Sequence, residues 1–96
     1  MYLLVTYDVE TTTSEGRKRL RKVAKCCQIF GQRVQNSVFE CLVDSAHYVS
    51  FKAELLSLIS MDKDSIRIYH LGKGYKEKIE QFGVQSSFEI EGTLIL

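Results

Sequence analysis

The sequence predicts an α+β fold whose elements follow the order β-α-β-β-α-β, and three observations support this class. The chain opens on a run of β-branched, aromatic and aliphatic residues, 2–7, which is typical of a buried strand. Two later segments repeat apolar residues at helical spacing, and short runs rich in β-branched and aromatic residues lie between and after them. The length of 96 residues, with 45% hydrophobic and 26% charged residues, suits a single globular domain.

The first strand ends at Asp8, and polar residues follow it. Strands that are apolar along their whole length are usually covered on both faces. We expect Asp8 to lie where the sheet opens to solvent, because a carboxylate held rigidly at such a place can still meet a ligand. The alternative is that Asp8 only caps the strand or begins a turn.

The first helix should begin near Thr12, which stands three residues before Glu15 at the spacing of a capping box. Gly31 follows its end, where a C′ glycine is favoured. The apolar stripe between them is Leu20, Val23, Ala24, Cys27 and Phe30.

Basic residues crowd into this helix with almost no acid among them. They are Arg17, Lys18, Arg19, Arg21, Lys22 and Lys25. A solvated polar face is the ordinary explanation of such charges. The lack of interspersed acids also indicates contact with phosphates, and the net charge of only +1 makes any such basic face local.

The next two strands are predicted at residues 32–34 and 38–43, and they should form an antiparallel hairpin because only the turn residues Gln35, Asn36 and Ser37 separate them. Asp44 or Ser45 should cap a second helix that ends near Ser60. A fourth strand is predicted at residues 65–71, and a short fifth strand at 78–82.

This order is that of a ferredoxin-like sandwich, in which two split β-α-β units place both helices on one face of an antiparallel sheet. We expect this domain to span residues 1–83. The opposite face needs a cover, and a second copy of the chain would provide it. The predicted assembly is a symmetric homodimer packed sheet to sheet, with two copies of Asp8 near the axis. The tail, residues 84–96, is predicted to bind a partner, to add a strand to a sheet edge, or simply to fray.

The cysteines and the apolar runs indicate a cytoplasmic protein. Cys26, Cys27 and Cys41 are odd in number and contain no CxxC pair, so neither a zinc site nor a disulfide framework is predicted. The N-terminus lacks the features of a signal peptide. No apolar run approaches the roughly 20 residues of a membrane span, so we expect no membrane partner.

Four segments carry a family resemblance that runs from Met1 to about Gly83. They are Tyr2-Leu3-Leu4-Val5-Thr6-Tyr7-Asp8, Arg17-Lys18-Arg19-Leu20, Arg33-Val34-Gln35-Asn36-Ser37-Val38-Phe39-Glu40-Cys41 and Asp64-Ser65-Ile66-Arg67-Ile68-Tyr69. In this order they resemble the small CRISPR-associated adaptation protein family, the ferredoxin-like subunit that works with the integrase in acquiring spacers. The third segment is the most specific, and it is similar to the branch found beside type I systems.

The resemblance implies a homodimeric, metal-dependent endonuclease of antiviral defence that binds Mg²⁺ (or Mn²⁺) between two copies of Asp8. Asp8 would be both the catalytic and the metal-binding residue, with Tyr7 and Phe39 as supporting residues. The implied partners are a CRISPR integrase subunit and nucleic acid, which would be double-stranded DNA, single-stranded RNA or both. Nucleic-acid binding is expected at Arg17, Lys18, Arg19, Arg21, Lys22, Lys25 and Arg33.

Physical chemistry permits this activity, because Mg²⁺ keeps several waters and is often bound by one or two carboxylates and a substrate phosphate. No histidine lies near Asp8 in the sequence, and His47 and His70 are expected to be surface or structural residues, so we expect slow turnover.

The alternative is a non-catalytic dimeric scaffold that holds DNA between integrase subunits. An RNA-recognition motif is disfavoured because residues 38–41 lack its aromatic signature. A metabolite-binding regulatory domain is disfavoured by the basic helix.

Overall fold

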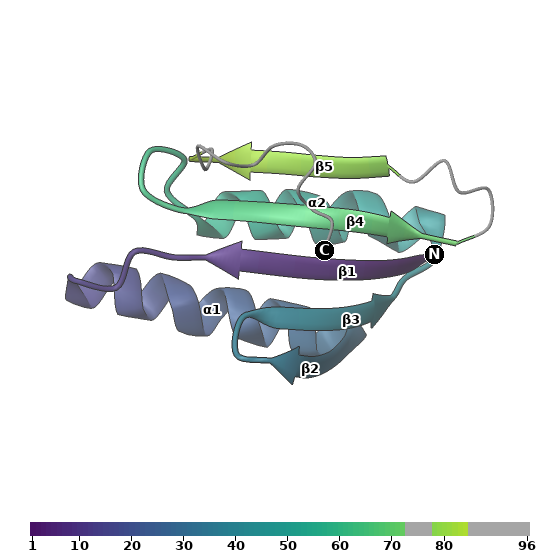
Figure 1. The fold of residues 1–96 in the computed structure, drawn as a ribbon, viewed down its shortest axis with the longest axis horizontal. Coiled ribbons are helices and arrows are strands. Elements are labelled where there is room, and N and C mark those ends of the chain that lie inside the picture. The colour runs from purple at the N-terminus through teal and green to yellow at the C-terminus, as the bar shows by residue number, and fades with distance from the viewer. Residues whose placement is uncertain (73–77, 85–96) are drawn as a thin grey trace.

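Five antiparallel strands form one sheet, and two helices pack on one of its faces (Figure 1). The computed structural model describes residues 1–72 and 78–84. The strands are β1 (Tyr2–Asp8), β2 (Gly31–Gln35), β3 (Val38–Leu42), β4 (Ser65–Leu71) and β5 (Lys78–Gly83), and the helices are α1 (Ser14–Phe30) and α2 (Ser45–Leu58). The α+β class, the hairpin and the fifth strand are confirmed. The predicted tail lies outside the described residues, apart from Val84.

The sheet has the order β2-β3-β1-β4-β5, with β1 at its centre. Tyr2 lies opposite both Leu42 of β3 and Leu71 of β4, and Asp8 lies opposite Ser65 of β4. Alternate residues of β1 are buried, so the odd-numbered side chains of this strand face the helices and the even-numbered ones face away. Among the described residues, no helix covers this second face (Figure 1).

The cap of α1 differs by one residue from the prediction. Thr13, not Thr12, is the N-cap, and its Oγ1 accepts a hydrogen bond from the backbone N–H of Gly16 at 3.0 Å. Thr12 donates its hydroxyl hydrogen to the carboxylate of Glu10 instead. The capping box with Glu15 was therefore wrong, because a neighbouring acid binds the threonine that would have formed it.

Gly31 ends α1 as predicted, but it is not a left-handed cap. Its φ of −165° and ψ of −164° are extended, so α1 passes directly into β2. A Cβ at this position would lie 1.9 Å from the carbonyl oxygen of Glu40 on β3. Glycine is needed here because the two backbones approach closely, not because of its freedom at positive φ.

Asp44 caps α2 through a 2.7 Å hydrogen bond from the backbone N–H of His47, as predicted. The helix ends at Leu58, slightly before the predicted end. The core lies between the sheet and both helices, and its largest fully buried side chains include Leu3, Phe39 and Leu55. Each such side chain contributes about 1.5–3 kcal/mol of burial. No helix among the described residues is long and apolar enough to span a membrane.

Candidate functional site

Asp8 is exposed at the end of β1, on the face of the sheet that turns away from the helices. Within residues 1–72 and 78–84, no hydrogen bond or ion pair engages its carboxylate. The backbone beneath it is fixed, because Asp8 is paired with Ser65 in the central ladder between β1 and β4. A free carboxylate on a rigid strand can bind a cation or accept a proton without first breaking another contact.

A depression of about 190 Å³ lies beside Asp8 and is also lined by Arg67 and Gln81. Arg67 donates from Nε and Nη2 to Oε1 of Gln81, at 3.0 and 2.9 Å. The amide nitrogen of Gln81 donates in turn to the backbone oxygens of Phe82 and Val84, at 3.2 and 3.1 Å. Arg67 and Gln81 were not among the site residues predicted from the sequence. Alternation along residues 65–71 was the available signal, because Ile66 and Ile68 are buried and Arg67 must point the other way.

A buried ion pair holds this end of the sheet together. Arg19 donates from Nε to Oδ2 of Asp64 at 2.7 Å, and the side chain of Asp64 is fully buried while that of Arg19 is 19% exposed. The same carboxylate accepts backbone N–H groups from Glu10, at 3.0 Å, and Ser60, at 2.8 Å. Burial opposes ionisation of Asp64, but these donors outweigh it and lower the pKa of the carboxyl.

This pair changes the role assigned to Arg19. Arg19 was predicted to contact nucleic acid, but its guanidinium binds the carboxylate of Asp64 inside the fold. The ion pair joins the start of α1 to the loop after β1 and to the loop between α2 and β4, so we assign Arg19 a structural role. Asp64 gave no local signal of this contact, because its partner is 45 positions away in the chain.

The supporting residues Tyr7 and Phe39 are buried on the helix side of the sheet, opposite the face that carries Asp8. Their rings stack with centroids 6.2 Å apart, and the Arg33 guanidinium lies 5.1 Å from the Phe39 centroid. Nη1 of Arg33 donates to the carbonyl oxygen of Asn36 at 2.9 Å. Burial raises the pKa of the Tyr7 hydroxyl. Their rings therefore shape the β2–β3 hairpin and orient Arg33 on the helix side of the sheet. Tyr7, next to Asp8 in β1, also lines the Asp8 depression, whereas Phe39 does not.

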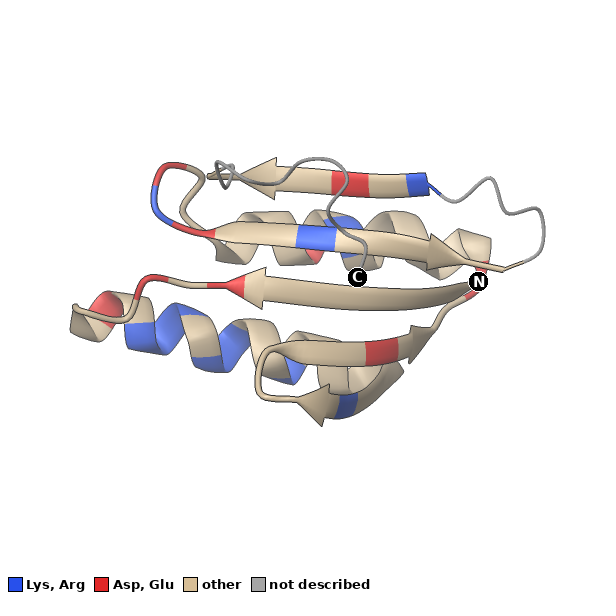
Figure 2. Ribbon diagram, viewed as in Figure 1, with Lys and Arg blue, Asp and Glu red and all other residues tan. Residues whose placement is uncertain are grey.

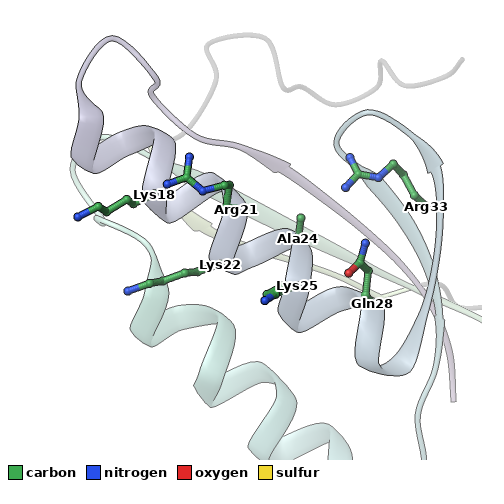
Figure 3. A pocket seen from close by; sticks show the side chains of 7 residues that line it. All are labelled: Lys18, Arg21, Lys22, Ala24, Lys25, Gln28 and Arg33. Atoms are coloured by element: carbon green, nitrogen blue, oxygen red, sulfur yellow. The ribbon is translucent and has the colours of Figure 1, made fainter.

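The basic residues of α1 line a groove of about 600 Å³ between this helix and β2. Figure 2 shows how the basic residues gather on α1, and Figure 3 shows the groove side chains projecting from α1 and β2. Its cationic residues are Lys18, Arg21, Lys22, Lys25 and Arg33. Arg17 does not line the groove, and its Nη1 donates to the backbone oxygen of Thr11 at 3.1 Å. The basic groove belongs to the helix layer, whereas Asp8 lies on the other face of the sheet.

A second polar cluster centres on Glu80, on the helix side of β5. Its carboxylate contacts Nε2 of His70 at 2.6 Å, the hydroxyl of Tyr48 at 2.5 Å and Nζ of Lys52 at 2.9 Å. Burial opposes ionisation of Glu80, but these three contacts lower its pKa to about 2. The cluster fastens β5 to α2. His70 thus has the structural role expected from the sequence, and it lies on the face opposite Asp8.

The residues of one chain could hold a magnesium ion only together with ligands from a second copy of the chain. Within the described part of the chain, no three His, Cys, Asp or Glu side chains are grouped so as to hold a metal ion. Asp8 nevertheless supplies a free carboxylate, which is the hard oxygen ligand that Mg²⁺ prefers. A second Asp8 from another copy, waters and a substrate phosphate would complete the coordination.

Comparison with known proteins connects this arrangement to one family. The family model for CRISPR associated protein Cas2 matches residues 1–79. The CRISPR-associated endonuclease Cas2 of Halalkalibacterium halodurans is 59% identical over 95 residues, which cover 99% of each chain. The CRISPR-associated endoribonuclease Cas2 of Chlorobaculum tepidum is 50% identical over 96 residues, the whole of both chains. A crystal structure of Streptococcus pyogenes Cas2 at pH 6.5 superposes with a TM-score of 0.72 and 59% identity, covering 78% of this chain and 90% of that one.

Proposed function

This chain belongs to the Cas2 family of CRISPR-associated proteins, and on that premise we propose that it is a metal-dependent endonuclease of spacer acquisition. The observation that carries the proposal is the exposed carboxylate of Asp8 at the end of the central strand, which has no hydrogen-bond or ion-pair partner in the part of the chain that the structure describes. The names of relatives support it, since they include both an endonuclease and an endoribonuclease. The proposed substrates are therefore the phosphodiester bonds of double-stranded DNA, single-stranded RNA or both.

The active unit that we propose is a homodimer of ferredoxin-like domains packed face to face through the open sheet. The strand order and the placement of both helices on one face support the ferredoxin-like assignment. Apolar side chains that remain exposed on this face support the dimer. Tyr2 is 45% exposed, and its cross-strand partners Leu42 and Leu71 are 71% and 39% exposed. A second copy would cover this row and remove it from water.

In this dimer the two Asp8 carboxylates would lie near one axis and hold a single Mg²⁺ (or Mn²⁺) between them. When bound, the cation would neutralise negative charge on the phosphate as it is attacked. Asp8 would contribute its oxygen ligands from a strand end whose backbone is held in the β1–β4 ladder, so the strand itself would not need to move. The described residues of this face offer no histidine to act as a general base, and slow turnover follows from that sparse site.

The basic groove would hold the nucleic-acid backbone, because clustered lysine and arginine side chains contact phosphates without reading the sequence. Since the groove and Asp8 lie on different faces, a nucleic acid bound along α1 need not be cut at the Asp8 of the same protomer. This geometry favours the second candidate function, a dimeric scaffold that holds DNA between CRISPR integrase subunits. The two functions are compatible in one molecule.

A cleavage assay tests the proposal. Wild-type protein and Asp8→Asn are incubated with linear double-stranded DNA and with single-stranded RNA, in magnesium, manganese or a chelator. We expect cutting by the wild type with metal only, and none by Asp8→Asn. Glu54→Gln is the matched control, because it removes one exposed carboxylate from α2, on the other side of the sheet from Asp8 and from the proposed dimer interface. Equal residual cutting by the wild type and Asp8→Asn would refute the catalytic role and leave the scaffold.

A further inference from the structure

We propose that Arg67 forms a phosphodiester-binding subsite beside Asp8 and that Gln81 orients it. The inference deepens the proposed function by naming the group that would hold the substrate phosphate at the cutting site. It begins from the shared depression, which brings together side chains from β1, β4 and β5. Of the described residues that line this depression, Arg67 is the only cation.

The register of the sheet sets the separation of Asp8 and Arg67. Asp8 is paired with Ser65, and Thr6 is paired with Arg67, so Asp8 and Arg67 are diagonal neighbours on the same face. Diagonal neighbours in an antiparallel pair are roughly 7–8 Å apart. Within the described residues, the two side chains form no ion pair with one another. This spacing would let Arg67 bind a phosphate group whose other side faces the cation that Asp8 is proposed to hold.

Gln81 presents the guanidinium in a fixed orientation. It accepts from Nε and Nη2 of Arg67, and its own amide is held by the backbone of β5 and Val84. Within the described residues, Nη1 of Arg67 donates to no acceptor and remains available to a ligand. A planar guanidinium with free N–H groups is the side chain best suited to phosphate oxygens. Because Gln81 is neutral, it orients Arg67 without neutralising its charge.

The contrast with Arg19 and Arg33 makes this assignment specific. Arg19 forms an ion pair with the buried carboxylate of Asp64, and Arg33 lies over the Phe39 ring on the helix side of the sheet. The cations of the basic groove belong to the helix layer. Arg67 alone among these combines a partly exposed guanidinium with a place on the Asp8 face. The competing explanation is that Arg67 and Gln81 only fasten β5 to β4 as a cross-strand pair.

The test compares Arg67→Ala and Arg67→Lys with the matched control Lys63→Ala, which removes one exposed cation from the α2–β4 loop. Cleavage is measured with magnesium, and binding of a short DNA duplex and of a single-stranded RNA is measured by anisotropy in an Asp8→Asn background. We expect Arg67→Ala to slow cleavage by about 100-fold, as for loss of one preorganised donor, with Arg67→Lys intermediate. Added guanidinium should partly restore Arg67→Ala, and Lys63→Ala should match the wild type.

Each other result has a definite meaning. Cleavage by Arg67→Ala at the wild-type rate overturns the subsite. Loss of activity together with a lower Tm and without guanidinium rescue also overturns it, in favour of the cross-strand pair. If the wild type does not cut at all, the nuclease proposal fails, and the binding arm decides the subsite separately. Weaker binding by Arg67→Ala than by Lys63→Ala then supports the subsite, and equal binding overturns it.

Discussion

Replacing Asp64 with alanine should be among the most destabilising single changes in this protein. The substitution removes a fully buried carboxylate that accepts backbone N–H groups from Glu10 and Ser60 and pairs with Arg19. It leaves two backbone donors and one guanidinium without their acceptor. Since the pair joins the loop after β1 to the start of α1 and to the α2–β4 loop, all three segments lose a common anchor.

The magnitude follows from the separate costs. Breaking a buried ion pair by removing one partner costs about 3–5 kcal/mol. An unsatisfied backbone donor costs about 1–3 kcal/mol, but part of this is already contained in the first figure. We therefore expect the free energy of unfolding to fall by about 4 kcal/mol, out of the roughly 5–15 kcal/mol typical of a small domain. For a chain of this length, that corresponds to a fall in Tm of roughly 15–30 °C.

Differential scanning calorimetry at one fixed protein concentration measures the effect, because dimerisation would make Tm concentration-dependent. The matched control is Asp62→Ala, which removes an exposed carboxylate from the same loop. That variant should melt within a few degrees of the wild type. If Asp64→Ala melted as Asp62→Ala does, the ion pair would not hold this end of the sheet, and Arg19 would return to the nucleic-acid surface.

Three further predictions follow from the contacts. The pKa of the Glu80 carboxyl is lower in the folded state than its unfolded value of about 4.3, so its ionised form stabilises the fold at pH values above 4.3, and this stability is lost as the pH falls towards 2. In melting curves recorded between these pH values, Glu80→Gln should therefore show a smaller fall in Tm with decreasing pH than the wild type. Reversing Arg21 and Lys25 to glutamate should weaken DNA binding and reduce the slope of log affinity against log salt by about 2, whereas Lys63→Glu should leave both unchanged in a salt titration. Gly31→Ala should lower Tm in thermal melts, because its Cβ would collide with the β3 backbone; a wild-type Tm would show that the backbones can separate cheaply.

Local pattern was enough to predict most of the fold. The apolar run to Asp8, the turn residues of the hairpin and the capping aspartate of α2 each act within a few residues, so the sequence displays them directly. The position of Asp8 at the end of a strand could also be predicted from the sequence, because a strand end is a local feature. Prediction was less exact at the start of α1, where Thr12 and Thr13 are both able to cap and a contact with Glu10 decides between them.

The remaining features depend on contacts between distant parts of the chain. The extended backbone of Gly31 is set by the carbonyl oxygen of Glu40, and the role of Arg19 is set by Asp64. Neither partner is visible in a local window. By contrast, the sequence alone was enough to predict that Asp8 and its neighbour Tyr7 point to opposite faces of the sheet, because adjacent residues of a strand point to different sides.

The central claim is that two Asp8 carboxylates act together at one shared site, and subunit mixing tests it most directly. Wild-type and Asp8→Asn chains are unfolded together, refolded as random dimers in varied ratios, and assayed for cleavage with magnesium. If both carboxylates are required, activity falls with the square of the wild-type fraction, to about a quarter at equal mixing. A linear fall, to about half at equal mixing, would mean that each Asp8 acts alone and would contradict the shared site.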